Sequence, residues 1–279
     1  MSKALFRKMF VVCVAVVFGF VAGSANAELL YDFDGLNTGD LDGQDGWVRT
    51  GATGLAIAEI ATGATGWSGN YLTSTGNVNS ARATDLSSVI VDNVGFDFSA
   101  KVNVIASSPS VLNHNMAGIQ DYDFDTSALG SYLRVGTRSD PDTSGNYQIE
   151  WWGSSDLGTG GNTVRIYEDL GMGSGEELVF IVGWEVLALG SDQYQFTPYY
   201  ENLTEGGDKT YKDSDAFTKT ISGISGKWNA LYARGADQSG RYLDDLRVGE
   251  IGEIPEPSTL ALLATGLIGL LAYAWRRRK

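Results

Sequence analysis

Cysteine and histidine are almost missing from this sequence of 279 residues, which has one of each. Cys13 lies between Val12 and Val14 in an apolar N-terminal run, and we interpret it as an ordinary apolar residue rather than a lipidation site. The rest of the chain therefore has no disulfide, thiolate metal site or cysteine nucleophile. Metal sites built from several imidazoles are excluded too. Any Ser-His-Asp triad would need His114, which we place in a surface loop over residues 110–115.

Basic residues are scarce over most of the chain. All 34 acidic residues lie within residues 28–256, whereas seven of the 20 lysines and arginines lie outside that range, which leaves it a net charge of −21. A surface this acidic repels phosphate backbones, so we expect no nucleic-acid partner. The same carboxylates keep an exported protein soluble, and they are also oxygen ligands for divalent cations.

The first 27 residues have the pattern of a targeting segment. Three basic residues within the first eight precede an apolar run over 9–22, and Ala25 and Ala27 form a small-x-small cleavage box. The run is too short and wrongly flanked for a membrane span, so we predict a cleaved signal peptide over residues 1–27. Its partners would be the Sec translocon and signal peptidase, and the rest of the chain would cross the inner membrane.

Proline is rare as well: the chain has 5, against 36 glycines. Between residues 28 and 252, short runs of alternating apolar and polar residues are separated by Gly, Asn, Asp and Ser, which is the pattern of strands and turns. The runs that we predict as strands cover residues 29–33, 55–60, 94–105, 115–124, 132–138, 147–152, 163–167, 178–189, 194–200, 217–221, 228–233 and 242–248. No window favours an amphipathic helix with caps. We therefore expect an all-β body, a single antiparallel β-sandwich domain over residues 28–252.

Both ends of this body resemble a known fold. The stretches similar to the first and last strands of concanavalin A-like (laminin-G-like) jelly rolls are residues 31–35, 39–41 and 43–47 at the start and 242–248 at the end. Such jelly rolls are common in exported bacterial proteins. The resemblance implies that the two ends of the body pair in one sheet, which would bring Asp32 or Asp34 near Asp244 or Asp245.

Residues 253–279 form a second separate segment. Pro255, Glu256 and Pro257 precede 17 uncharged residues, 259–275, which as a helix would span about 26 Å. The prolines disfavour helix and strand, so they predict an extended segment at the outer face of the membrane. The basic residues that follow this transmembrane helix are Arg276, Arg277, Arg278 and Lys279. The positive-inside rule keeps them in the cytoplasm with the body outside.

This combination resembles the PEP-CTERM sorting signal over its full length. The resemblance implies that an exosortase, a membrane-embedded transpeptidase, cuts near the motif and removes the transmembrane helix. It also implies a Gram-negative host that makes exopolysaccharide or biofilm matrix. We therefore expect a protein that is anchored transiently in the membrane and then reaches the cell surface or the extracellular matrix. A permanent single-span anchor is the alternative.

Glycan hydrolysis is the obvious enzymatic possibility for a jelly roll, and it needs two carboxylates roughly 5 to 10 Å apart. Glucanases of this fold carry them on one strand as Glu-x-Asp-x-x-Glu or Glu-x-Asp-x-Glu. Glu150, in Glu-Trp-Trp-Gly, comes closest and lacks the partner carboxylates. We therefore predict no enzymatic activity, and a secreted glycosidase or lyase with unusual carboxylates is the alternative.

Aromatic residues are abundant, and two adjacent pairs are Trp151 with Trp152 and Tyr199 with Tyr200. In a strand the members of each pair point to opposite faces, so we expect one to pack in the core and the other to lie at the surface. Surface aromatic side chains hold sugars by stacking on their apolar faces. These four residues are the candidate carbohydrate contacts of a non-enzymatic module that binds extracellular polysaccharide or other matrix components. A structural coat protein without a specific ligand is a further alternative.

Calcium is the one cofactor that the residues suggest, because Ca²⁺ takes six to eight oxygen ligands. Three groups are rich in such oxygens: Asp121, Asp123 and Asp125; residues 140–146; and the terminal-strand residues Asp32, Asp34 and Asp245. None matches an EF-hand loop, and solvated strand faces and Asx turns are the commoner explanation. A structural calcium ion bound by the terminal-strand aspartates is thus an expectation, and no other cofactor is predicted.

Overall fold

The computed structural model describes most of the body of the chain. The described residues are 28–52, 58–63, 67, 69–74, 78–106, 113–140, 146–154, 156–157, 163–173, 175–235 and 242–250. The predicted signal peptide with Ala25 and Ala27, and the segment 253–279 with its motif, lie outside them. Within the described part of the chain, no helix is long and apolar enough to cross a membrane.

The body is built from two antiparallel sheets, a ten-stranded and a seven-stranded one. The ten strands are β1 (Glu28–Tyr31), β2 (Gly39–Asp40), β4 (Ala58–Thr62), β5 (Asn70–Ser74), β7 (Phe96–Ile105), β12 (Glu177–Gly190), β13 (Gln193–Asn202), β14 (Thr210–Tyr211), β15 (Phe217–Thr220) and β17 (Leu243–Glu250). The seven are β3 (Trp47–Ala52), β6 (Val78–Ala83), β8 (Asn113–Asp123), β9 (Ala128–Asp140), β10 (Asn146–Gly153), β11 (Val164–Asp169) and β16 (Ala230–Gly235). Two short 3₁₀ helices, η3 (Asp213–Asp215) and η4 (Ile224–Gly226), complete the described elements.

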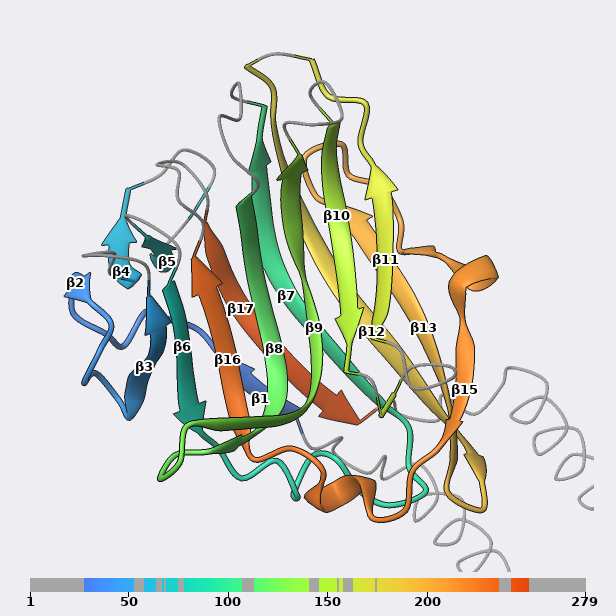
Figure 1. Ribbon diagram of the computed structural model, residues 1–279. Helices are drawn as coiled ribbons and strands as arrows, with labels where there is room; N and C mark the ends of the chain where they lie inside the picture. The colour runs from blue at the N-terminus through green and yellow to red at the C-terminus, as the bar shows by residue number, and fades with distance from the viewer. Residues whose placement is uncertain are drawn as a thin grey trace, which may run out of the picture. The chain divides into compact units, whose positions relative to one another are not determined.

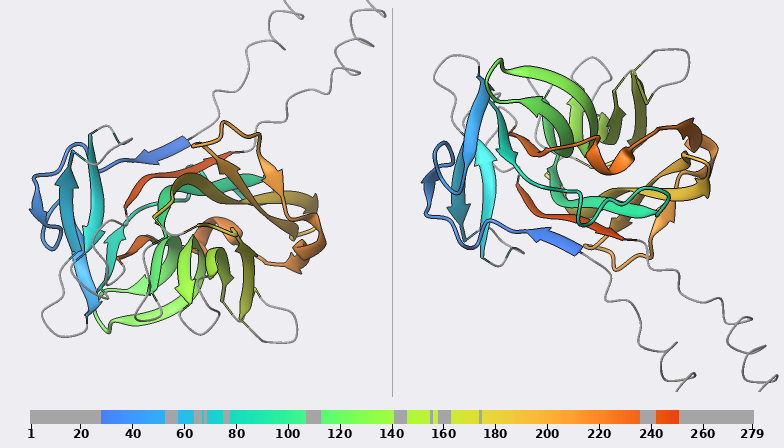
Figure 2. Two further views of the ribbon diagram at one scale, coloured as in Figure 1. Left: turned by 90° about the horizontal axis from the view of Figure 1, so that it is seen from above. Right: turned by 90° about the horizontal axis from the view of Figure 1, so that it is seen from below.

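The order of the strands is that of a sandwich with many crossovers. The ten-stranded sheet runs β14-β13-β12-β7-β17-β5-β4-β2, with β1 paired to β17 and β15 to β13. The seven-stranded sheet runs β11-β10-β9-β8-β16-β6-β3. Figure 1 shows β8, β9 and β10 side by side, and Figure 2 shows the two sheets as layers. The predicted antiparallel β-sandwich of jelly-roll type is therefore confirmed.

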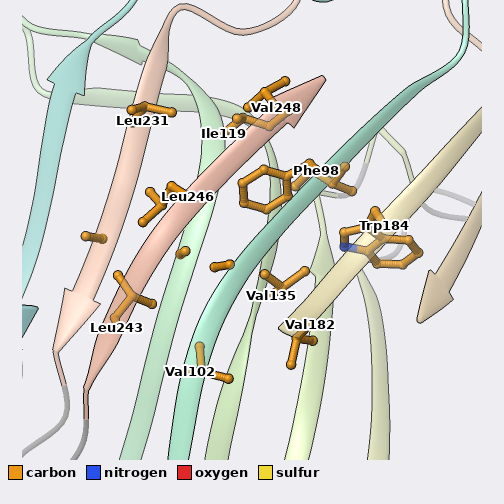
Figure 3. Packing of buried hydrophobic residues seen from close by; sticks show 14 of the residues in the cluster. Phe98, Val102, Ile119, Val135, Val182, Trp184, Leu231, Leu243, Leu246 and Val248 are labelled. Atoms are coloured by element: carbon orange, nitrogen blue, oxygen red, sulfur yellow. The ribbon is translucent and has the colours of Figure 1, made fainter. Parts of the chain in front are cut away.

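One continuous apolar core lies between the sheets, because every second side chain of each long strand points inward. Phe98, Trp184 and Leu246 of the ten-stranded sheet meet Ile119 and Val135 of the seven-stranded sheet (Figure 3). Residues 26–250 form one compact unit. Since this core lies wholly within that unit, we expect the body to fold without the terminal segments.

Two buried tryptophans connect the sheets by hydrogen bonds. The Trp151 indole of β10 donates to the carbonyl oxygens of Gly183, at 2.9 Å, and Tyr199, at 3.2 Å, on the ten-stranded sheet. The Trp184 indole of β12 donates in the other direction, to the carbonyl oxygen of Arg134 at 3.1 Å. Both indoles thus satisfy their N–H groups inside the core, where an unmet donor would cost about 1–3 kcal/mol.

Each of the twelve predicted strands has a counterpart in the structure, with ends that differ by a few residues. Three strands of five or six residues escaped prediction: β3, β5 and β6. Their sequences, Trp-Val-Arg-Thr-Gly-Ala, Asn-Tyr-Leu-Thr-Ser and Val-Asn-Ser-Ala-Arg-Ala, are rich in small and polar residues. Pairing with neighbouring strands, rather than intrinsic propensity, places them in the sheets.

The ends of the body pair as the resemblance implied. β1 lies antiparallel to β17, with Leu30 opposite Arg247 and Tyr31 opposite Leu246. The Asp244 carboxyl in β17 is buried, and the nearby backbone N–H groups of Asp245 and Phe33 favour its charged form. The first and last strands of the body are thus joined by their ladder, and Asp244 of the last strand lies near Phe33, two residues after the first.

Candidate functional site

The outer face of the ten-stranded sheet carries a polar cluster whose members satisfy one another. The Tyr199 hydroxyl donates to Asp97 at 2.7 Å, and the Tyr211 hydroxyl donates to Glu185 at 2.7 Å. Lys209 lies 3.1 Å from Asp97 and 3.6 Å from Glu185, with its ammonium 3.6 Å from the centre of the Tyr199 ring. Burial raises the pKa of the Asp97 carboxyl, and Lys209 opposes that shift. These contacts all join members of the cluster to one another.

The outer face of the seven-stranded sheet is different. This outer face is the side of the seven-stranded sheet that points away from the core. The residues on it that concern the site are His114, Gly118, Arg134, Gly136, Glu150, Trp152 and Arg165. The inward phase of the same strands is apolar, with Ile119, Val135 and Trp151 in the core. The outward phase is polar, yet Glu150 is 0% exposed, His114 7% and Arg134 8%. Buried charges of this kind must find partners.

Glu150 and His114 form the first contact on this face. Glu150 Oε1 and His114 Nδ1 are 2.6 Å apart, although the residues belong to β10 and β8, which are separated by β9. Gly136 of β9 pairs with both Glu150 and Met116, so the two groups meet diagonally over this glycine of the intervening strand. In the neutral tautomer whose Nδ1–H donates a hydrogen bond to the Glu150 carboxylate, the lone pair is on Nε2. That nitrogen can then accept a hydrogen bond.

Arg134 forms the second contact. It lies opposite Gly118, where a Cβ atom would be 2.6 Å from its Cγ, so the glycine makes room for the arginine. Its guanidinium is 4.3 Å from the centre of the Tyr132 ring and 3.7 Å from that of Tyr232, and it donates to Gln120 Oε1 at 2.8 Å. Burial lowers the pKa of the Arg134 guanidinium and raises the pKa of the Tyr232 hydroxyl.

Three polar atoms at the centre of this face have no hydrogen-bond partner among the described residues. They are Glu150 Oε2, Arg134 Nε and Trp152 Nε1, and all three are buried. Trp152 follows Glu150 by two positions on β10, and it lies opposite Arg134 of the neighbouring strand β9. An unmet buried polar group is unfavourable, so three such groups side by side point to a site built for something other than stability.

The tryptophan and tyrosine pairs separate as strand alternation requires. Trp152 and Tyr199 lie on outward faces, the first half-buried and the second 3% exposed beneath Lys209. Trp151 is 0% exposed, and Tyr200 packs against the core with its ring 6.3 Å from that of Trp151. The expectation of sugar contact is therefore wrong for Trp151, which is fully buried, and it stays a prediction for Tyr199 and for the half-buried Tyr200. It stays open for Trp152, which lies on the outer face.

The sequence did not predict the contact between His114 and Glu150. His114 lies in β8 and is buried, rather than in a surface loop, because its ring bonds Glu150 and lies against Trp152 at 5.1 Å. One sequence signal was present. Gln148, Glu150 and Trp152 alternate along the strand with Ile149 and Trp151, so they point away from the core that these two residues enter. That phase identifies the outward side of β10, but it does not identify the partner strand.

The aspartates proposed as calcium ligands do not come together. Within the described residues, no three Asp, Glu, His or Cys side chains are placed to hold a metal ion. Asp34 accepts a hydrogen bond from the Asn70 N–H at 2.6 Å, and Asp32 accepts one from the Asp34 N–H at 3.2 Å. Asp245 is instead the bulge residue of β17, with φ at 47°. Calcium binding stays a prediction without a site in this part of the chain.

The other two oxygen-rich groups show no metal site within the described residues either. Asp121 and Asp123 are exposed at the end of β8, and Asp125 lies in the turn that follows. Asp123 accepts hydrogen bonds from the N–H groups of Asp125 and Thr126, which is the Asx-turn explanation. Residues 141–145 of the third group lie outside the described residues.

Gly136 provides a test of the geometry of this face. A Cβ atom at this position would lie 2.0 Å from the Asn115 carbonyl oxygen and 2.8 Å from Met116 Cα, both backbone atoms. We expect Gly136→Ala to lower the free energy of unfolding by about 1–3 kcal/mol, because β8 and β9 must separate. Urea unfolding measures the change.

Gly153→Ala, at the end of β10 in the same sheet, is the matched control. Its new Cβ would have Val164 Cβ at 3.5 Å as its nearest neighbour, an ordinary contact. We expect a change below about 0.5 kcal/mol. Equal losses in the two variants would contradict the close strand approach described at Gly136.

The C-terminal segment matches a known family model. The PEP-CTERM protein-sorting motif matches residues 253–279. The chain carries a PEP-CTERM sorting motif. The motif makes this an exported protein that is sorted to the surface, with an exosortase as its processing partner. The resemblance seen in Pro255, Glu256, Pro257 and the terminal basic residues is thereby confirmed. No curated protein matches the sequence.

Solved structures show the fold of the body. The globular domain of T. cruzi calreticulin superposes with a TM-score of 0.50 at 12% identity, covering 89% of this chain and 98% of that domain. The CBM2 module of the evolved Dit of Lactobacillus casei BL23 phage J-1 has a TM-score of 0.41, 13% identity and coverage of 82% and 98%. Endo-β-1,4-glucuronan lyase from Trichoderma reesei superposes with a TM-score of 0.41 at 9% identity, covering 76% of this chain and 93% of the lyase. At such identities the likeness shows the sandwich fold and nothing of function.

Proposed function

We propose that the body is a non-enzymatic module that binds polysaccharide of the cell surface or extracellular matrix, to which its PEP-CTERM motif delivers it. The observation that carries this proposal is the outer face, where Glu150 Oε2, Arg134 Nε and Trp152 Nε1 are buried without partners among the described residues. A sugar chain presents hydroxyl groups that both donate and accept, so it suits a face where the half-buried Trp152 and the exposed Arg165 cover an unmet acceptor and two unmet donors.

The rival is a secreted glycosidase or lyase, and one feature favours it: Glu150 is a buried carboxylate oriented by His114. Hydrolysis with a pair of carboxylates requires a second one nearby. The strand partners of Glu150 are Gly136 and Tyr167, and those of Trp152 are Arg134 and Arg165, so no carboxylate lies directly opposite either residue. The diagonal neighbour Asp169, opposite Gln148, accepts a hydrogen bond from the Gln148 side chain at 2.5 Å. This arrangement supports binding over turnover. A coat protein without a ligand is the remaining alternative.

A glycan array combined with a reducing-sugar assay on residues 28–252 separates these functions. We expect retention of polysaccharides without release of reducing ends. Trp152→Ala should weaken binding at least tenfold, equivalent to about 1.4 kcal/mol. Tyr211→Ala, an aromatic residue that is 39% exposed on the other sheet, is the control and should bind as before. Turnover that Glu150→Gln abolishes would establish the enzyme instead, and a blank array would favour the coat protein.

A further inference from the structure

Four aromatic rings of the outer face share one feature: each has a guanidinium stacked on it. Arg165 lies 4.4 Å from the centre of the Trp152 ring, and Arg138 lies 4.9 Å from that of Tyr167. Arg134 lies between Tyr132 and Tyr232, at 4.3 and 3.7 Å. Three arginines from β9 and β11 thus occupy ring faces that a neutral sugar would need for stacking.

A stacked guanidinium is well prepared for one class of ligand. The ring holds the flat group in place by cation–π attraction, and the N–H edge stays available for hydrogen bonds. Two parallel N–H groups match the two oxygens of a carboxylate, and such bidentate pairs are stronger than neutral hydrogen bonds. The face therefore offers oriented donors for carboxylates in place of open platforms for neutral sugars.

The distribution of ion pairs supports the same conclusion. Arg49, Arg82, Lys209, Lys212 and Lys227 each have a carboxylate within salt-bridge distance. Within the described part of the chain, Arg134 and Arg165 of the outer face have none, and neither do Lys101 and Arg247 of the other sheet, although residues 28–256 carry a net charge of −21. In so acidic a protein, Arg134 and Arg165 of this face are thus left to neutralise a ligand, and each has its guanidinium stacked on an aromatic ring, a geometry that Lys101 and Arg247 do not share.

We propose that the outer face binds a carboxylated polysaccharide, whose uronate groups are received by Arg165 and Arg138 at the surface with Arg134 beneath them. This inference rests on the proposed polysaccharide-binding function and specifies the chemistry of its ligand. Arg165 is exposed and Arg138 half-buried, so both reach solvent. The acidic remainder of the body repels a polyanion, but at physiological ionic strength salt screens charges that are more than about 8 Å apart. A bidentate contact acts at about 3 Å and is not screened in this way.

Calorimetric titration of residues 28–252 at 0.15 M salt tests this proposal. The probes are polygalacturonate, the same polymer after chemical reduction of its carboxyl groups, a sulfated glucan and single-stranded DNA. We expect polygalacturonate to bind at least tenfold more tightly than each of the other three. Arg165→Gln and Arg138→Gln should each weaken that binding about tenfold or more, and Arg247→Gln, an exposed arginine on β17 of the other sheet, should leave it unchanged.

Each other outcome has a defined meaning. Equal binding of the reduced polymer would overturn the carboxylate inference and leave polysaccharide binding intact. Equal binding of sulfated glucan or DNA would show a response to charge of any kind and would overturn it too. No binding to any glycan would remove the proposed function itself. Unchanged affinity in Arg165→Gln and Arg138→Gln, with melting temperatures equal to the parent, would place the site elsewhere.

Discussion

Replacing Trp151 with alanine is expected to lower the free energy of unfolding of the body by about 3–5 kcal/mol. The side chain is 0% exposed and lies in the core between the two sheets. Its indole N–H also donates to the carbonyl oxygens of Gly183 and Tyr199 on the opposite sheet. Truncation therefore leaves a cavity as large as the ring system and removes a direct connection between the layers.

The adjacent Trp152 provides a matched control, because it has the same chemistry on the other side of the same strand. Trp152→Ala should cost less than about 1.5 kcal/mol, since its half-buried ring contacts Arg165 and His114 on the outer face rather than the core. Urea unfolding followed by tryptophan fluorescence and circular dichroism measures both variants. If the two substitutions cost the same, or if Trp152→Ala costs more, the orientation of β10 described above is wrong.

This pair illustrates how much of the fold could be predicted from the sequence. Alternation along β10 requires Trp151 and Trp152 to face opposite sides, and the polar phase of Gln148 and Glu150 identifies the outward one. The same local pattern located twelve strands and the sandwich class. Strands such as β5 and β6 could not be found in this way, because their small and polar residues adopt strand geometry through pairing with β4 and β16.

The candidate site was less accessible to prediction, because its contacts cross strands that are distant in the sequence. Glu150 and His114 are 36 positions apart, and they meet diagonally over Gly136 of the strand between them. Arg134 reaches Tyr232 only because Gly118 opposite it has no side chain. Each contact depends on register, which no local pattern specifies. The PEP-CTERM motif is the opposite case: it is a linear signal, so the sequence alone was sufficient.

Asp244 is expected to make the body less stable as the pH rises from about 4 to about 7. Its carboxyl is 4% exposed, and burial raises its pKa from 3.8 to about 7. The neighbouring Asp245 adds to this shift, whereas the N–H groups of Asp245 and Phe33 and the charge of Lys101 oppose it. Lys101 of β7 lies opposite Asp244 of β17 in the sheet, and its ammonium lies over the Trp67 ring at 4.3 Å.

The sign follows from proton binding. Between pH 3.8 and about 7 the unfolded chain has lost the Asp244 proton while the folded chain retains it, so each increase in pH favours unfolding. The full shift corresponds to about 4 kcal/mol, an upper figure for this group. Burial raises the pKa of Asp97 as well, which adds a smaller slope of the same sign. Asp156, with its pKa lowered to about 2 beside Lys227, acts in the opposite direction and below this window.

Asp244→Asn removes the ionisable group while it keeps the shape and an acceptor oxygen for the backbone N–H groups. We expect this variant to match the parent near pH 4 and to exceed its stability by about 2–4 kcal/mol at pH 8. Asp245→Asn is the comparison variant, because asparagine also tolerates the positive φ of this position. Since the Asp245 charge helps to raise the pKa of Asp244, this variant should weaken the pH dependence without removing it. Urea unfolding from pH 4.5 to 8 gives both profiles. A parent whose stability rises across that range, or an Asp244→Asn profile parallel to it, would show that Asp244 is ionised in the folded protein and held by Lys101.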